Sequence, residues 1–176
     1  MARLGEGITF AQRLTLYHNL GPDPAGRPRF AEVGEQAGSA LATRRVWRGL
    51  AWADFDNDGD PDFLVTACNG RPMLLRNDGG NQHHWLKVQL EGVKSNREGL
   101  GSRVEVEAGG RRQSGWVRSG SSYCSSSELK ALFGLGGARR AERVVVRWAS
   151  GKEEVVRDVA ADQLLLIREG HGIVRR

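Results

Sequence analysis

The sequence predicts an all-β protein, and three observations lead to this prediction. In several short stretches, apolar and polar residues alternate at every second position, which is the period of a half-buried strand. Glycine is abundant, with 24 residues among 176, and paired turn residues separate the stretches. Only residues 127–133 have a pattern that suits a helical turn. We therefore expect many short strands and almost no helix.

The second half of the chain, residues 82–170, is predicted to form a small β-sandwich or barrel-like domain. Five stretches carry the strand patterns: residues 86–90, 103–107, 144–148, 153–159 and 164–167. The dipeptides Gly109-Gly110 and Ser150-Gly151 are typical of tight hairpin turns.

The first part, residues 1–80, is predicted to be a separate and incomplete propeller blade region. The pattern L-x-x-N-x-G at residues 16–21 recurs 58 residues later at residues 74–79, and a repeat of this kind is typical of blades. Residues 78–81 form a turn or linker by their composition. Because a propeller needs several blades to protect its sheet edges, we expect open edges and self-association, or a piece of a longer protein.

The most distinctive stretch is residues 54–62, which carries a carboxylate at every second position. Without a counter-charge, five such anions in one loop would repel one another. Ca²⁺ prefers six to eight oxygen ligands in flexible geometry, so the stretch predicts a calcium loop. Gly59 would allow the sharp bend. The predicted ligands are the side chains of Asp54, Asp56, Asp58 and Asp62 and the backbone carbonyl of Asp60.

The start of this loop matches the EF-hand pattern, but the rest does not. An EF-hand needs a bidentate Glu at position twelve, where this chain has Val65, and it leads into a helix. Here an apolar run at residues 63–67 follows, so the loop is expected to join two strands, at residues 49–53 and 62–67. The alternative is a solvated acidic turn that binds no metal.

Residues 49–65, with the sequence GLAWADFDNDGDPDFLV, resemble a VCBS or FG-GAP repeat. That resemblance implies a calcium-loaded propeller blade and a place in the family of proteins like cartilage acidic protein. It also implies a bacterial protein with an extracellular or periplasmic location. Residues 1–10 lack the apolar segment of a signal peptide, so a fragment or a cytoplasmic protein are the alternatives.

Residues 82–169 resemble an ASPIC/UnbV domain, which commonly follows VCBS repeats. The stretches that carry this resemblance are residues 84–88, 94–104, 118–123, 133–136 and 146–151. Cys124 and Ala149 depart from the family pattern, where an apolar residue and Pro are usual. The resemblance implies architecture more than mechanism. Some bacterial relatives sit in enediyne biosynthesis clusters, which implies an alternative role in secondary metabolism.

The charge balance suggests a second alternative, a basic polyanion binder. The net charge is +5, and 22 of the 26 basic residues are arginines, which pair well with phosphate. The arginines are scattered, however, and no nucleic-acid motif accompanies them, so a nucleic-acid partner is not expected. No apolar stretch of 18 residues exists, so no membrane span is expected either.

We predict that the chain is not an enzyme and has no catalytic residue. Residues 119–128 offer hydroxyls, a thiol and a carboxylate, but no histidine spacing supplies a base. We expect the hydroxyls of this loop to satisfy its own backbone. Cys68 and Cys124 are expected to be small buried thiols, although a disulfide stays open. The predicted function is a non-catalytic calcium-binding module with a protein or glycan partner.

Overall fold

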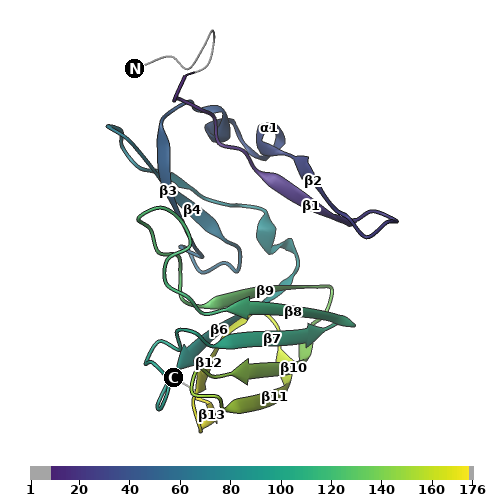
Figure 1. Cartoon of the computed structure of the whole chain (residues 1–176). Coiled ribbons are helices and arrows are strands. Elements are labelled where there is room, and N and C mark those ends of the chain that lie inside the picture. Colours follow the sequence, from purple (N-terminus) through teal and green to yellow (C-terminus); the bar gives the residue numbers. More distant parts are fainter. Residues whose placement is uncertain (1–8, 175–176) are drawn as a thin grey trace. The chain divides into compact units, whose positions relative to one another are not determined.

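The computed structural model describes residues 9–174, and most elements in this range are strands, with only short helical turns besides (Figure 1). The all-β prediction is therefore confirmed. The chain divides into two compact units. Unit 1 comprises Met1–Gly49 and Leu64–Leu75, and unit 2 comprises Leu50–Phe63 and Arg76–Arg176. The domain boundary near residue 80 stays a prediction.

Unit 1 contains a hairpin, two short helical turns and parts of a three-stranded sheet. The antiparallel hairpin pairs β1 (Tyr17–Pro22) with β2 (Pro28–Glu32), and α1 (Gly34–Ala37) and the 3₁₀ turn η1 (Ser39–Ala42) follow. The sheet has the order β3-β4-β5. Its strands are β3 (Trp47–Ala53), β4 (Asp62–Ala67) and β5 (Met73–Leu75), and the first two contribute residues to both units.

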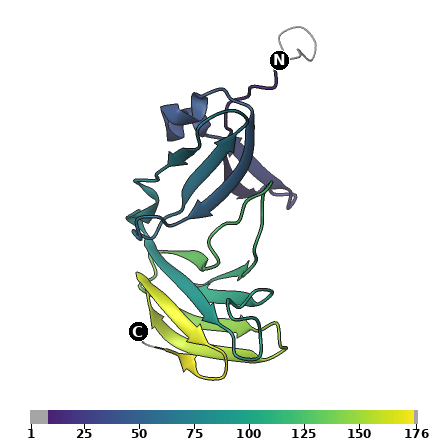
Figure 2. The same cartoon turned by 90° about the vertical axis from the view of Figure 1, so that its left-hand side faces the viewer.

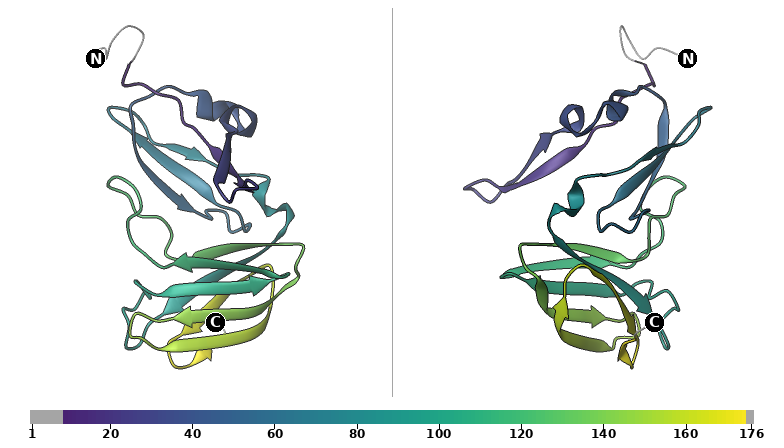
Figure 3. Two further views of the ribbon diagram at one scale, coloured as in Figure 1. Left: turned by 45° about the vertical axis from the view of Figure 1, so that its right-hand side comes forward. Right: turned by 180° about the vertical axis from the view of Figure 1, so that it is seen from behind.

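Unit 2 is built from two four-stranded sheets (Figure 3). The first has the order β11-β10-β7-β8, and all of its neighbouring strands are antiparallel. The second has the order β13-β12-β6-β9, and here β6 and β12 run parallel, side by side (Figure 2). The strands are β6 (His84–Glu91), β7 (Arg103–Ala108), β8 (Arg111–Trp116), β9 (Ala131–Gly136), β10 (Arg140–Arg147), β11 (Glu153–Ala160), β12 (Gln163–Arg168) and β13 (Gly172–Ile173).

One hydrophobic core lies between these two sheets. Alternate residues of β6 and β7, such as Leu86, Val88 and Val104, are fully buried in it, and Val146 and Ile167 join them from β10 and β12. Burying each such side chain contributes about 1.5–3 kcal/mol. Neither sheet closes on itself within the described residues, so the barrel-like alternative is wrong. Two open sheets over a shared core remain.

The predicted hairpin turns are confirmed, but the predicted helical turn is wrong. Gly109 and Gly110 have φ angles of +56° and +74° and join the antiparallel strands β7 and β8, as a two-residue turn requires. Residues 131–136 form β9 instead of continuing a helix, because Ala131, Phe133 and Leu135 alternate into the core. No helix among residues 9–174 is long and apolar enough to cross a membrane.

Both cysteines are free, and both are exposed, which corrects the expectation of buried thiols. The Sγ atom of Cys68 lies 2.9 Å from Nε of Arg48. Cys124 has a φ angle of +47° and lies in a turn between Ser122 and Ser125, which form a β-bridge. The position in a tight surface turn explains why this thiol is not packed in the core.

A buried carboxylate fixes the loop that follows β6. Glu169, the residue directly after β12, is only 3% exposed. Its Oε2 atom accepts hydrogen bonds from the backbone N–H groups of Val93, Lys94 and Ser95 at 2.7–2.8 Å. The hydroxyls of Ser95 and Ser150 donate to its Oε1 atom. Burial by itself raises the pKa of Glu169, but the bonds from Ser150, Ser95, Val93 and Lys94 outweigh it and lower the pKa to about 2.

Replacement of this carboxylate should change how stability depends on pH. Since the folded-state pKa of Glu169 lies below its ordinary value of 4.5, its contribution is present above pH 4.5 and is lost as the pH falls toward about 2. Glu169→Gln should lower the free energy of unfolding at neutral pH by about 2–3 kcal/mol and flatten this acid dependence. Urea unfolding at neutral and acidic pH measures both effects. The half-exposed Glu153, changed to Gln, is the control. Parallel pH curves for Glu169→Gln and the parent would contradict this account.

Candidate metal site

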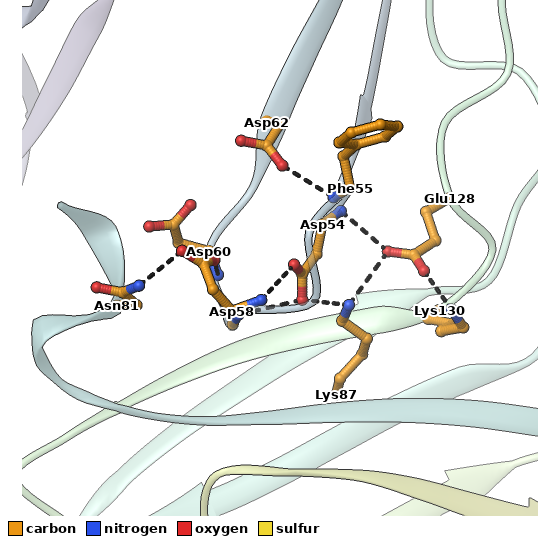
Figure 4. Close-up of polar contacts among 10 residues, drawn as sticks. Asp54, Phe55, Asp58, Asp60, Asp62, Asn81, Lys87, Glu128 and Lys130 are labelled. Atoms are coloured by element: carbon orange, nitrogen blue, oxygen red, sulfur yellow. Dashed lines mark hydrogen bonds and ion pairs between the residues drawn. The ribbon is translucent and has the colours of Figure 1, made fainter. Parts of the chain in front are cut away.

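The acidic loop joins β3 to β4 and lies within unit 2, where its polar contacts can be followed in Figure 4. Asp54 is the first residue after β3, and Asp62 is the first residue of β4. Gly59 has a φ angle of +98°, a conformation that a side chain would disfavour. The predicted strand–loop–strand arrangement and the bend at Gly59 are therefore confirmed.

Three of the five predicted ligands come together in the structure. Asp54, Asp56 and Asp58 each offer a carboxylate oxygen, and these atoms lie within 4.8 Å of one another. Asp54 is buried, Asp58 is half-buried and Asp56 is exposed. A group of this size and chemistry could hold a metal ion while leaving one side open to solvent.

The carboxylates of the other two aspartates, Asp60 and Asp62, accept hydrogen bonds from nearby backbone N–H groups. Asp62 is 2% exposed and accepts hydrogen bonds from the N–H groups of Phe55 and Asn77, both at 2.8 Å. Asp60 is 1% exposed, and its Oδ2 atom accepts from the N–H of Gly80 at 2.9 Å. Its Oδ1 atom is buried and has no hydrogen-bond partner among residues 9–174. Metal ligation by the Asp62 side chain and by the Asp60 carbonyl stays a prediction.

The loop carries more negative charge than its surroundings neutralise. Desolvation raises the pKa of Asp56, and the carboxylates of Asp58 and Asp62 raise it further. Burial likewise raises the pKa of Asp60, with Asp58 adding to the effect. Both shifts have the direction expected for anions held close to other anions. A bound cation would remove this repulsion.

A buried lysine, which sequence analysis missed, contacts the site. Lys87 of β6 is 2% exposed, and its Nζ atom forms an ion pair with Asp54. The same Nζ atom lies 3.7 Å from Oε2 of Glu128, which also accepts the N–H of Asp54 at 3.3 Å. Lys130 pairs with the other oxygen of Glu128 at 2.5 Å. The alternation along β6 suggested a solvent-facing Lys87, because it lies between the core residues Leu86 and Val88.

Trp85 explains why Gly59 cannot carry a side chain. A Cβ atom built on Gly59 would lie 2.0 Å from Nε1 of Trp85 and 2.2 Å from its Cε2 atom. Real atoms do not approach so closely, so the indole ring occupies the space that any other residue would need. The bend of the acidic loop and its packing on β6 therefore both depend on glycine.

The serine-rich segment, residues 119–128, is held against strand β3. Ser122 Oγ accepts the N–H of Leu50 at 3.2 Å, and Ser125 Oγ donates to the carbonyl of Leu50 at 2.8 Å. Ser127 Oγ accepts the N–H of Trp52 at 3.2 Å. These three hydroxyls bond to the backbone of β3. The expectation that the hydroxyls of residues 119–128 satisfy the backbone of that same loop is therefore wrong for these three. They position Glu128 beside the acidic loop.

Gly59→Ala should destabilise the protein far more than a change at a comparable glycine. Ala at positive φ costs about 1–2 kcal/mol, and displacement of Trp85 adds about 1–3 kcal/mol. Gly110→Ala is the matched control, because its φ angle is +74° and nothing lies within 4 Å of the added Cβ. Chemical denaturation measures both losses. Equal losses for the two variants would rule out the steric role of Trp85.

Lys87→Met should leave Asp54 and Glu128 buried without their cation. Breaking a buried ion pair from one side costs about 3–5 kcal/mol. The control is Lys152→Met, because Lys152 is 47% exposed in its pair with Glu154 and should matter by about 1 kcal/mol or less. Thermal unfolding in a chelator compares the two. A loss for Lys87→Met no larger than for Lys152→Met would show that Lys87 does not stabilise the loop.

Comparison with known proteins assigns part of the chain. Residues 92–174 match the family model described as ASPIC and UnbV. No curated protein matches the chain. The match begins inside unit 2, after the acidic loop and β6, and ends with the last described residue. The second half of the predicted resemblance is thereby confirmed, whereas the VCBS/FG-GAP assignment of residues 49–65 stays a prediction. Over residues 92–174 the chain is similar to the family described as ASPIC and UnbV.

Proposed function

We propose that the chain is a non-catalytic binding module in which Ca²⁺ orders the loop of residues 54–62. The observation that carries this proposal is the convergence of Asp54, Asp56 and Asp58, whose ligand atoms lie within 4.8 Å of one another. These are positions one, three and five of the loop, the positions that provide carboxylates in calcium loops. A VCBS or FG-GAP type of loop accounts for this spacing.

Hydrogen bonds and ion pairs within the loop leave part of its negative charge without a counter-charge. Within the described part of the chain, Asp58 accepts hydrogen bonds only from neutral groups, the N–H of Asp60 and the amide of Asn81. Asp56 is exposed, and no hydrogen bond or ion pair joins it to another residue between 9 and 174. Lys87 contacts Asp54 alone among the three, and it is shared with Glu128. One shared ammonium balances less charge than the cluster carries, which favours an ion over a bare acidic turn.

The choice of Ca²⁺ follows from the ligand chemistry. Carboxylate and carbonyl oxygens suit hard divalent cations, and the uneven burial of the three carboxylates suits an ion that accepts irregular geometry and several waters. Mg²⁺ demands a near-ideal octahedron and dehydrates reluctantly. In this proposal the ion has a structural role, because it would tie the loop together beside the fixed segment 119–128.

The alternatives remain separate predictions. An accessory protein or enzyme of secondary metabolism would act through residues 119–128, but Ser122, Ser125 and Ser127 hold strand β3 there. Activity lost in Ser121→Ala or Cys124→Ala without loss of folding would favour that role. A polyanion binder would show a steep salt dependence. Self-association and an extracellular or periplasmic location also stay predictions.

Calcium should stabilise the protein in a way that depends on Asp56. With an affinity of about 10 μM, within the range of calcium loops, a free concentration of about 1 mM would add roughly 2.7 kcal/mol. Mg²⁺ at the same concentration should add much less. Asp56→Ala should remove most of the calcium effect at little structural cost, because no hydrogen bond or ion pair joins Asp56 to another residue between 9 and 174. Thermal unfolding in EDTA, calcium and magnesium measures these differences.

Asp78→Ala provides the matched control for this experiment. The Asp78 side chain is 69% exposed and, among residues 9–174, pairs only with Arg76, so its loss should leave the calcium response unchanged. Isothermal titration with calcium should give one site for the parent and for Asp78→Ala. An unfolding midpoint of the parent that is identical in EDTA and in calcium would refute the proposal and restore the bare acidic turn.

A further inference from the structure

We propose that a cleft in unit 2 binds an acidic saccharide, that is, a sugar ring that carries a carboxylate. The cleft has a volume of about 360 Å³, within the usual size of small-ligand sites. Its walls come from β3, β8, β9 and the segment between β8 and β9. The inference rests on the proposed function only in taking the chain as a binding module, and it does not require the calcium ion.

Two tryptophans provide apolar surface in this cleft. Trp116 of β8 is 59% exposed, and Trp52 of β3 is half-buried. The guanidinium of Arg103 lies 5.9 Å from the centroid of the Trp116 ring, which helps to hold the indole in place. An indole left open to water is an unusual use of a large aromatic side chain. The C–H face of a pyranose ring is flat and weakly apolar, so it would cover such an indole.

Polar groups around the tryptophans match the hydroxyls of a sugar. Ser121 and Ser127 line the cleft, and their hydroxyl oxygens are 3.1 Å apart. Gln113 donates through Nε2 to the carbonyl of Gly134 at 2.7 Å, which fixes the orientation of its amide. Hydroxyl and amide groups can both donate and accept hydrogen bonds, as sugar hydroxyls do. Beyond their bonds within the protein, these groups keep unused donor and acceptor capacity that a polar ligand can use and an apolar ligand cannot.

Arg118 gives the cleft a preference for a ligand that carries a carboxylate. It lines the cleft, and it makes no hydrogen bond or ion pair with any residue from 9 to 174. The other cation of the cleft, Lys130, is already paired with Glu128. A free guanidinium presents a planar fork of donors that fits a carboxylate with two parallel hydrogen bonds. An anionic group on the ligand would therefore meet Arg118.

The cleft is largely preformed. Ser127 of the cleft and Ser122 near it accept hydrogen bonds from N–H groups of β3, so the segment that carries Ser121 and Ser127 is fixed before a ligand arrives. Glu128 adds the backbone bond from its N–H to the carbonyl of Trp52 at 2.8 Å. A site held in this way loses little conformational entropy on binding. A low entropic cost favours measurable binding of a small, polar ligand.

The test is isothermal titration of the whole chain with trigalacturonate, with neutral galactotriose as the comparison ligand, in excess calcium and again in EDTA. We expect trigalacturonate to bind about tenfold more tightly than galactotriose. Trp116→Ala should weaken both sugars by about tenfold or more. Arg118→Gln should remove the preference for the acid and leave galactotriose binding unchanged, a pattern that a folding defect would not give.

Two control variants test whether the effects belong to the cleft. Tyr123→Ala removes an aromatic that is 67% exposed but does not line the cleft, and Arg111→Gln removes an exposed arginine of the same strand as Trp116. Both should change the affinities by less than about twofold. Equal losses in Arg111→Gln and Arg118→Gln would overturn the proposal in favour of general charge attraction.

Two further outcomes would also overturn it. One is the absence of trigalacturonate binding by folded, calcium-saturated protein. The other is triglutamate binding as tightly as trigalacturonate, which would show an anion site without sugar recognition. The two proposals can fail separately. Sugar binding with no calcium effect on stability would refute only the proposal of a calcium loop. A calcium effect without sugar binding would refute only the proposal of a saccharide site.

Discussion

The structure of unit 2 depends on how the chain closes a loop with five carboxylates in nine residues. Each carboxylate must find a donor, a counter-charge or water, because buried anions without partners are costly. Asp62 and Asp60 take backbone N–H groups from the segment after β5, and Asp54 takes Lys87. Asp56 and Asp58, together with Asp54, are left as the group that suits an ion. Asp54 and Asp58 have both roles, because they accept hydrogen bonds from N–H groups of the loop and also converge with Asp56.

The two faces of strand β6 have different roles beside the acidic loop. Leu86 and Val88 point into the core, whereas Lys87 points to the opposite face and is nevertheless buried. That face is covered because the acidic loop lies on it, with Gly59 against the ring of Trp85. A single strand therefore connects the packing of the two sheets to the electrostatics of the loop, and disturbance of either is expected to reach the other.

The proposed ion site and the proposed sugar site share one wall. Trp52 is followed two residues later by Asp54, and Glu128 lines the cleft while it accepts the N–H of Asp54. The Nζ atom of Lys87 contacts both Asp54 and Glu128 and so links the two sites. Such an arrangement lets a structural ion fix the position of residues that meet a ligand, without taking part in any chemistry.

The sequence by itself determined the strand content, the two hairpin turns and the convergence of Asp54, Asp56 and Asp58, because these follow from local alternation, turn residues and spacing. The tertiary structure alone decided the parallel pairing of β6 with β12, since partners so far apart in sequence leave no local pattern. It also decided the burial of Lys87, whose polar place in the alternation predicts exposure until another segment covers it. The cleft around Trp116 and Arg118 joins segments that no spacing relates, so only the packed sheets could reveal it.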